Sequence, residues 1–159
     1  MSENPKITYT PQQQAAIKTF GQNVLVAASA GSGKTKVLVE RVLHLLQNGI
    51  GVDELLVVNF TKAAAAEMKK RIQKSLQNAI KQLSKNDEQQ KQWLQRQLLK
   101  LKTADISTID AFCLHLIQQY YYVIGLDPVF RQLTDQTERQ MLAEDVWGQV
   151  REAKYGQNE

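Results

Sequence analysis

The sequence has few features of a secreted or membrane protein. It contains a single cysteine among 159 residues, Cys113, so no disulfide can form within one chain. No apolar run approaches the roughly 20 residues that a membrane-spanning helix needs. The first residues are polar and do not resemble a secretory signal. A single cysteine is compatible with a reducing compartment such as a cytoplasm, where thiols stay reduced.

The charge of the chain is unevenly distributed. The formal net charge is +4, and 43% of the residues are apolar, as in an ordinary globular domain. Residues 61–102 contain 11 lysines and arginines against 3 acidic residues, whereas residues 103–159 contain 4 against 9. A basic segment of this kind can attract a polyanion such as nucleic acid. A solvated helix surface is the simpler interpretation, and the pattern alone favours it.

The first 60 residues predict two helices and two strands. Thr10 followed by Pro11 indicates a helix start, and Gly21 its end. The apolar runs 23–28 and 55–60 predict buried strands, and the periodic segment 34–49 between them predicts a helix. Strand, helix and strand in this order form a βαβ unit, so the fold class is α/β with a parallel sheet.

The rest of the chain is mainly helical by pattern. Apolar residues three to four positions apart predict helices over 63–83, 88–101 and 111–124. Residues 105–108 predict a short third strand. Asp135 and Glu138 have the spacing of a capping box, which would begin a last helix running to about Tyr155.

The strongest motif lies between the first strand and the helix that follows it. It fits the Walker A pattern, except that Ala28 stands at the first glycine position. Gly31 and Gly33 allow backbone N–H groups to surround a phosphate. The Lys34 ammonium can reach the β- and γ-phosphates, and the Thr35 hydroxyl can bind Mg²⁺. The sequence therefore predicts ATP and Mg²⁺ as cofactors, with catalytic roles for Lys34 and Thr35. The predicted loop residues are Ala28, Ser29, Ala30, Gly31, Ser32, Gly33, Lys34 and Thr35.

Three further segments, together with this loop, resemble the UvrD/Rep-type superfamily 1 DNA helicases. Residues 10–17 (TPQQQAAI) resemble the Q motif, residues 59–68 (NFTKAAAAEM) resemble motif Ia, and residues 107–112 (STIDAF) resemble the next DNA-facing motif. The resemblance implies a partial RecA-like P-loop NTPase domain with extra helices. It also implies that Gln13 reads adenine. Asp110 stands where many members have histidine. The residues that the resemblance places against DNA are Asn59, Phe60, Thr61, Lys62 and Thr108.

Within that family the sequence is most similar to the helicase/nuclease subunits of bacterial double-strand-break repair complexes, the AddA or RexA group. The similarity rests on residues 25–35 and 63–68, and on Tyr120–Tyr122 followed by residues 126–130. It implies single- and double-stranded DNA as partners, a second subunit of the AddB or RexB type, 3′ to 5′ unwinding and a nuclease activity.

Several of these residues have plainer interpretations. Gln13 belongs to a run of glutamines and can be an ordinary surface residue. Phe60 can stack on a base or pack in the core, and periodicity does not distinguish the two. Asn59 and Thr61 can bind phosphate oxygens or simply cap the next helix.

One expected element of an ATPase is missing from the sequence. No hydrophobic strand ends in Asp-Glu to hold Mg²⁺ and position water. We therefore expect an N-terminal piece of a larger protein that cannot hydrolyse ATP alone. The resemblance implies that residues 1–133 form the first part of a RecA-like domain, called 1A in this family, and that residues 134–159 begin the helical domain 1B inserted into it. A UvrD/PcrA-like helicase without a nuclease and a non-catalytic nucleotide-binding module are the alternatives.

Overall fold

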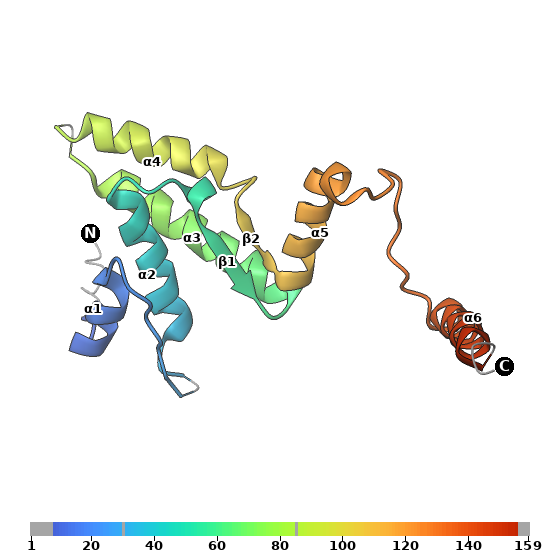
Figure 1. Ribbon diagram of the computed structural model, residues 1–159. Coiled ribbons are helices and arrows are strands. Elements are labelled where there is room, and N and C mark those ends of the chain that lie inside the picture. Colours follow the sequence, from blue (N-terminus) through green and yellow to red (C-terminus); the bar gives the residue numbers. More distant parts are fainter. Residues whose placement is uncertain (1–7, 30, 85, 156–159) are drawn as a thin grey trace. The chain divides into compact units, whose positions relative to one another are not determined.

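A computed structural model describes residues 8–29, 31–84 and 86–155 (Figure 1). The chain forms two compact units, the first ending at His115 and the second beginning at Leu116. The elements are α1 (Pro11–Lys18), α2 (Lys34–Gln47), η1 (Val52–Glu54), β1 (Leu56–Asn59), α3 (Lys62–Gln82), α4 (Glu88–Lys100), β2 (Asp105–Thr108), α5 (Ile109–Tyr120), η2 (Tyr121–Ile124) and α6 (Gln136–Tyr155).

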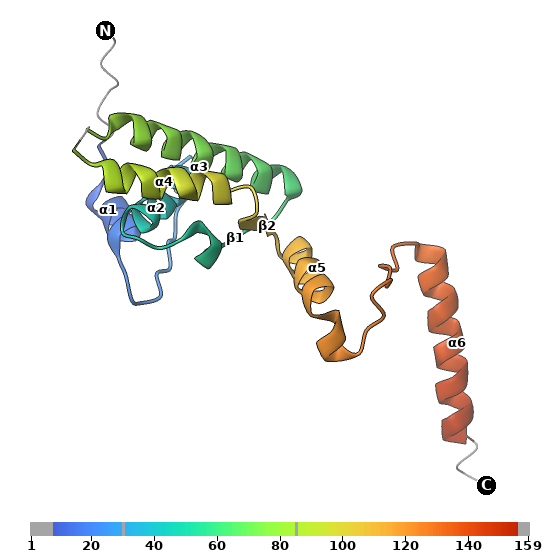
Figure 2. The same ribbon diagram turned by 90° about the horizontal axis from the view of Figure 1, so that it is seen from above.

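The sheet of the first unit has two parallel strands, β1 and β2. Leu56 pairs with Asp105 and Asn59 pairs with Thr108, so the carboxyl ends of both strands lie at one edge. The connection between them consists of α3 and α4, which lie side by side (Figure 2). The α/β class, a parallel sheet and the short strand at 105–108 are thus as the sequence predicts, but the parallel partner of β1 is β2 and not the predicted strand 23–28.

The core of the first unit lies between α2, α3, α4 and one face of the sheet. Val57 and Ile106 point into it, while Leu56 and Val58 on the other face of β1 are exposed. The predicted burial of this strand therefore holds for one face only, because the other face is not covered in the described residues. The fully buried side chains at the centre are Leu46, Val52, Ile72, Leu76, Leu94 and Gln97.

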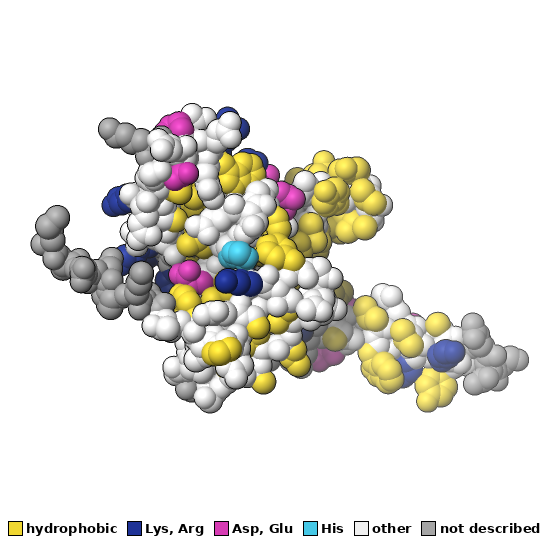
Figure 3. All heavy atoms as spheres, turned by 90° about the vertical axis from the view of Figure 1, so that its left-hand side faces the viewer, with side chains coloured by type: hydrophobic (Ala, Val, Ile, Leu, Met, Phe, Trp, Pro, Cys, Tyr) yellow, Lys and Arg dark blue, Asp and Glu magenta, His cyan; other side chains and the backbone are white. Residues whose placement is uncertain are grey.

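Residues 23–28 do not form the predicted strand. They have no assigned secondary structure, and Leu25 is 97% exposed, with Val24 and Val26 also exposed. Figure 3 shows hydrophobic side chains, in yellow, on the face of the molecule that is turned to the viewer. The apolar pattern is typical of a strand, but a strand also needs a hydrogen-bonding neighbour. The described residues provide none, so the predicted βαβ unit is not formed.

The helices agree closely with the sequence pattern because their determinants are local. In α3, Met68, Ile72 and Leu76 recur every four residues and are all buried. Thr61 caps this helix by accepting a hydrogen bond from the Ala64 N–H at 3.1 Å. The predicted break after α3 and the start of α4 at Glu88 are also found.

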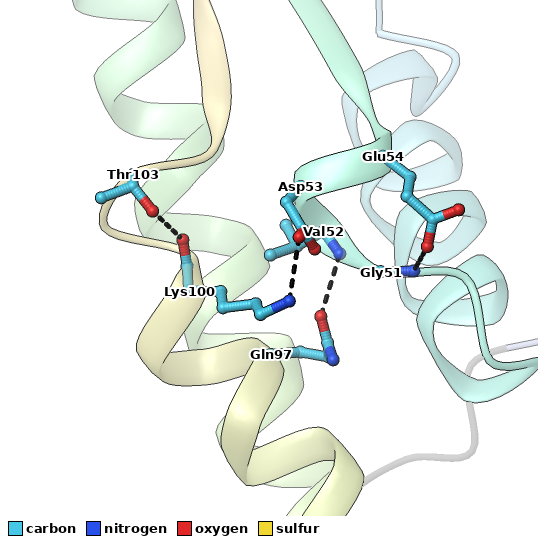
Figure 4. A network of polar contacts seen from close by, with 7 residues as sticks. All are labelled: Gly51, Val52, Asp53, Glu54, Gln97, Lys100 and Thr103. Atoms are coloured by element: carbon cyan, nitrogen blue, oxygen red, sulfur yellow. Dashed lines mark hydrogen bonds and ion pairs between the residues drawn. The ribbon is translucent and has the colours of Figure 1, made fainter.

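A polar network joins η1 to α4 (Figure 4). Gln97, 1% exposed, accepts a hydrogen bond at 2.9 Å from the Val52 N–H through its Oε1. Lys100 Nζ lies 2.9 Å from Asp53 Oδ2, and this hydrogen bond lowers the pKa of the Asp53 carboxyl. The network positions the segment that leads into β1.

The second unit has no buried core residue in its described part. Its η2 turn ends at Gly125, whose φ of 64° favours glycine. At the start of α6 the Glu138 N–H donates to Asp135 Oδ1 at 2.9 Å, as the capping pattern predicts. The Glu138 carboxylate pairs with Arg131, which lowers the pKa of Glu138. No helix in the described part of the chain is long and apolar enough to span a membrane.

Candidate functional site

Gln13 connects α1 to the loop before α2. The Thr10 N–H donates to Gln13 Oε1 at 3.0 Å, and the Gln13 N–H donates to Thr10 Oγ1 at 3.3 Å, which completes a capping box. Gln13 Nε2 donates to the Ser32 carbonyl at 3.2 Å. Gln13 is therefore a bridge between two segments rather than a free surface side chain.

The loop before α2 folds back on itself. Lys34 Nζ donates to the carbonyl oxygens of Ala28 at 2.6 Å and Ser29 at 2.7 Å. The Ser32 hydroxyl also donates to Ser29 at 2.8 Å. Gly33, with φ of 83°, is the N-cap residue of α2. The Lys34 ammonium thus lies over the loop carbonyls, at the end of α2 whose partial positive charge attracts anions.

Most of the predicted nucleotide residues surround one hollow of about 360 Å³ between α1 and the loop. Gln13, Ala28, Ser29, Ser32 and Lys34 line it. Gly31, Gly33 and Thr35 are close in sequence but do not line it, and the Thr35 side chain is exposed. Ala30 lies outside the described residues. The hollow is large enough for part of a nucleotide.

Three residues around this region were not predicted from the sequence. Thr10 and Gln12 line the same hollow. Arg41 and Lys34 together line a neighbouring hollow of about 420 Å³, and Arg41 Nη1 donates to the Ala16 carbonyl at 2.6 Å. A sequence feature could have identified Arg41. It lies two helical turns after Lys34, which places both residues on one side of α2.

Tyr9 also lies at the junction of α1 and α2. Its ring packs against Ala16, Ile17 and Val37, and Lys36 Nζ lies 5.5 Å from the ring centre. Partial burial, and next the nearby Glu40 carboxylate, raise the pKa of the Tyr9 phenol. The hydroxyl therefore stays protonated at neutral pH and helps to fix the two helices that border the hollow.

The predicted DNA-facing residues gather at the carboxyl edge of the sheet. Asn59 and Thr108 end the two strands and are paired in register. Phe60 follows β1 and is 100% exposed, so its alternative role in the core is wrong. Lys62 is the first residue of α3 and is exposed. This edge is where ligands bind in open α/β sheets.

Two side chains of this edge have structural hydrogen bonds. Thr61 caps α3, as its alternative interpretation proposed. Thr108 is 6% exposed, and its hydroxyl accepts from the Ala111 N–H at 3.3 Å. Asn59 Nδ2 is buried and has no hydrogen-bond partner among the residues that the structure describes. Phe60 and Lys62 are therefore the side chains best placed to meet a ligand.

The described residues offer few ligands for a metal ion. They contain no group of three or more His, Cys, Asp or Glu side chains that could bind one. Thr35 supplies a single hydroxyl oxygen. Mg²⁺ keeps several waters and phosphate oxygens in nucleotide sites, so Thr35 fits a Mg²⁺ ion that is bound together with a nucleotide.

Known proteins are similar to nearly the whole chain. Residues 9–158 match the UvrD/REP helicase N-terminal domain. The chain is 54% identical over 154 residues to an ATP-dependent helicase/nuclease subunit from Levilactobacillus brevis, a match that covers 97% of this chain and 12% of that protein. The protein of the same name from Ligilactobacillus salivarius is 57% identical over 148 residues, covering 92% and 12%.

A third relative of that name, from Enterococcus faecalis, is 48% identical over 151 residues, or 95% of this chain and 12% of the relative. The chain thus spans about 12% of the length of these curated relatives. Because the family match covers nearly all of its residues, the chain belongs to the UvrD/REP helicase family and corresponds to the N-terminal domain of that family.

Proposed function

We propose that this chain is the N-terminal ATP- and DNA-binding part of an ATP-dependent DNA helicase/nuclease subunit that acts in double-strand-break repair and recombination. The observation that carries the proposal is the hollow between α1 and α2. There Gln13, from one segment, lies beside Ser32 and Lys34 from another. An amide that can recognise adenine and an ammonium that can neutralise phosphate thus border one space.

In the proposed complex, Gln13 selects adenine and the loop residues surround the phosphates. Lys34 leaves the Ala28 and Ser29 carbonyls to bind the β- and γ-phosphates, and stabilises the charge that develops on the transferred phosphoryl. Thr35 contributes its hydroxyl to the nucleotide-bound Mg²⁺. Mg²⁺ supplies charge neutralisation between the phosphate oxygens when it is bound.

The same proposal assigns single-stranded DNA to the carboxyl edge of the sheet. Phe60 would stack on a base, and Lys62 would pair with a phosphate. In the whole protein, ATP binding and hydrolysis would close this domain against a second RecA-like domain. Repeated closure would drive the protein along single-stranded DNA in the 3′ to 5′ direction. A second subunit of the AddB or RexB type would complete the repair complex.

Replacing Lys34 by alanine tests the proposal in a longer protein that carries this chain. We expect ATP hydrolysis to fall about a hundredfold or more, because the transition state loses its main cation. DNA unwinding should be lost with it. Lys18→Ala is the matched control, since Lys18 is an exposed lysine at the end of α1 that does not line the hollow. Unwinding by the Lys34 variant at the wild-type rate would contradict the assignment.

The 159-residue chain by itself gives a second test. We expect at most weak nucleotide binding and no ATP turnover from it, because its sequence lacks the acidic residues that position water. Calorimetric titration with ATP and a phosphate-release assay measure the two quantities. Robust turnover by the purified chain would show that the catalytic site is complete.

A further inference from the structure

The exposed side of α3 carries lysines that the proposed single-strand site does not use. Lys69, Lys70, Lys74 and Lys81, which we call the lysine strip, follow at intervals of one, four and seven residues. At about 100° per residue, Lys70, Lys74 and Lys81 lie on the side of the helix opposite the buried Ala65, Met68, Ile72 and Leu76. Lys69 lies about 100° from Lys70, at the edge that faces the end of α4.

No acidic side chain in the described part of the chain forms an ion pair with the strip. Arg71 on the same helix, by contrast, pairs with Glu67. Lys70, Lys74 and Lys81 are exposed. A row of unpaired ammonium groups repels itself, and a partner that supplies a row of negative charges relieves that repulsion.

One end of the strip forms a basic hollow with the end of α4. Lys69 and Lys70 from α3, Gln73 and Lys102 line a space of about 320 Å³, floored by Leu98 and Leu101. Lys69 Nζ donates to the Lys102 carbonyl at 2.7 Å, so this ammonium is fixed at the rim. Three cations that meet at one hollow distinguish this surface from an ordinary solvated helix face.

We propose that the lysine strip and its hollow form a second DNA-binding surface, which holds the phosphate backbone of duplex DNA. From Lys69 to Lys81 the helix rises about 18 Å, close to five base pairs of B-form DNA at about 3.4 Å each. A single strand is the weaker candidate, because α3 has no aromatic residue on which bases could stack. This proposal rests on the proposed function, which places single-stranded DNA at Lys62, the first residue of α3. The duplex on the lysine strip would be the continuation of that DNA along the same helix.

The test compares two variants of the whole 159-residue chain. Lys70→Gln, Lys74→Gln and Lys81→Gln together remove three charges from the strip and leave the Lys69 hydrogen bond intact. Arg139→Gln, Arg151→Gln and Lys154→Gln remove three charges from α6, where these side chains are exposed. Glutamine and lysine have similar helix propensities, so circular dichroism should show unchanged helix content in both variants.

Fluorescence anisotropy with a labelled duplex of about 16 base pairs measures affinity from about 50 to 200 mM salt. We expect the strip variant to lose about tenfold in duplex affinity, and the slope of log K against log salt to become shallower by about 3. The α6 variant should bind as the unmodified chain does. Equal losses in both variants, or no loss in the strip variant, would overturn the proposal.

Two further measurements separate the competing explanations. Polyglutamate serves as a probe for an acidic protein partner. If the strip variant loses polyglutamate binding but binds duplex DNA as the unmodified chain does, the proposal is overturned in favour of such a partner. Affinity for oligothymidine should fall in a Phe60→Ala variant and not in the strip variant. If Phe60→Ala does not weaken oligothymidine binding but the strip variant still loses duplex affinity, the single-strand assignment is wrong. The second DNA-binding surface is then supported independently.

Discussion

Both ends of the Gln13 side-chain amide form hydrogen bonds within the chain. Its oxygen accepts from the Thr10 N–H at 3.0 Å, and its nitrogen donates to the Ser32 carbonyl at 3.2 Å. The first hydrogen bond belongs to the helix cap, and the second spans to the loop before α2. The two contacts can be separated by a substitution that keeps the oxygen and removes the donor.

Gln13→Glu makes that separation. The carboxylate retains the acceptor for the Thr10 N–H but cannot donate, and it adds a negative charge near the proposed phosphate site. In a longer protein that carries this chain, we expect ATP affinity to fall about tenfold or more, because a lost hydrogen bond in a polar site costs about 1–3 kcal/mol. Titration with a fluorescent ATP analogue measures this. Gln14→Glu is the control, since Gln14 Nε2 donates to the Tyr9 carbonyl outside the hollow. Equal affinity in the two variants would refute the assignment.

Phe60 tests the single-strand site because it is fully exposed at the sheet edge. Phe60→Ala should weaken binding of oligothymidine to the whole chain about 5- to 150-fold, since stacking of one base contributes about 1–3 kcal/mol. Thermal stability should not change, because the ring contributes nothing to the core. Leu99→Ala, on an exposed leucine of α4, is the matched control. A fall in melting temperature without a loss of affinity would mean that Phe60 has a structural role.

For single residues, the sequence predicted which side chains have a role better than it predicted what surrounds them. It identified Phe60 as the residue after a buried strand but could not distinguish core packing from exposure, because the neighbouring elements that decide it are distant in sequence. It placed Gln13 by motif alignment, whereas the bond to Ser32 depends on how the α1 segment folds beside the loop. Arg41 was missed because helical arginines are usually solvated.

Among the elements, the link between η1 and α4 depends on one buried glutamine. Gln97 Oε1 accepts from the buried Val52 N–H, while Gln97 Nε2 is buried and has no partner in the described part of the chain. Gln97→Leu removes the acceptor and leaves that N–H unsatisfied, so we expect the free energy of unfolding to fall by about 1–3 kcal/mol. Urea denaturation measures the change. Gln95→Leu, at an exposed position of α4, should change stability by less than about 0.5 kcal/mol. An unchanged or higher stability of the Gln97 variant would show that relief of the unpaired Nε2 outweighs the lost bond.

The elements show which structures a sequence can specify locally. The start of α1 at Thr10 and Pro11 and the four-residue repeat in α3 are signals contained within a few residues, and both predictions are confirmed. Residues 23–28 have an equally clear apolar pattern, yet they are not a strand here. Strand formation requires a partner from another part of the chain, and a local pattern carries no information about that partner.

Across the whole molecule, the two units differ in how much of them is buried. The first has a continuous core around Leu46, Ile72 and Leu76, whereas α6 has no buried residue. We expect hydrogen exchange monitored by mass spectrometry to show the strongest protection in α3 and α4, and near-complete exchange of α6 within seconds to minutes. Helices without tertiary packing open easily, which gives this difference. Equal protection of α3 and α6 would contradict it.

The domain division predicted at residue 133 stays a prediction. It concerns how these residues join a larger protein, and a chain covering about 12% of its relatives' length does not test it. The charge division is a property of the chain itself. The basic segment 61–102 corresponds to α3, α4 and their flanks, and the acidic segment 103–159 includes β2, α5 and α6.

The open face of the two-stranded sheet also governs how the purified chain behaves at high concentration. Leu56 and Val58 on that face, and Leu25 in the irregular segment 23–28, are exposed to water. Contact between copies would remove this apolar surface from solvent at about 25 cal/mol per Å². The net charge of +4 opposes such contact only while salt does not screen it. Colloidal stability should therefore decline as salt and protein concentration rise together, and dilute, low-salt solutions suit the isolated chain best.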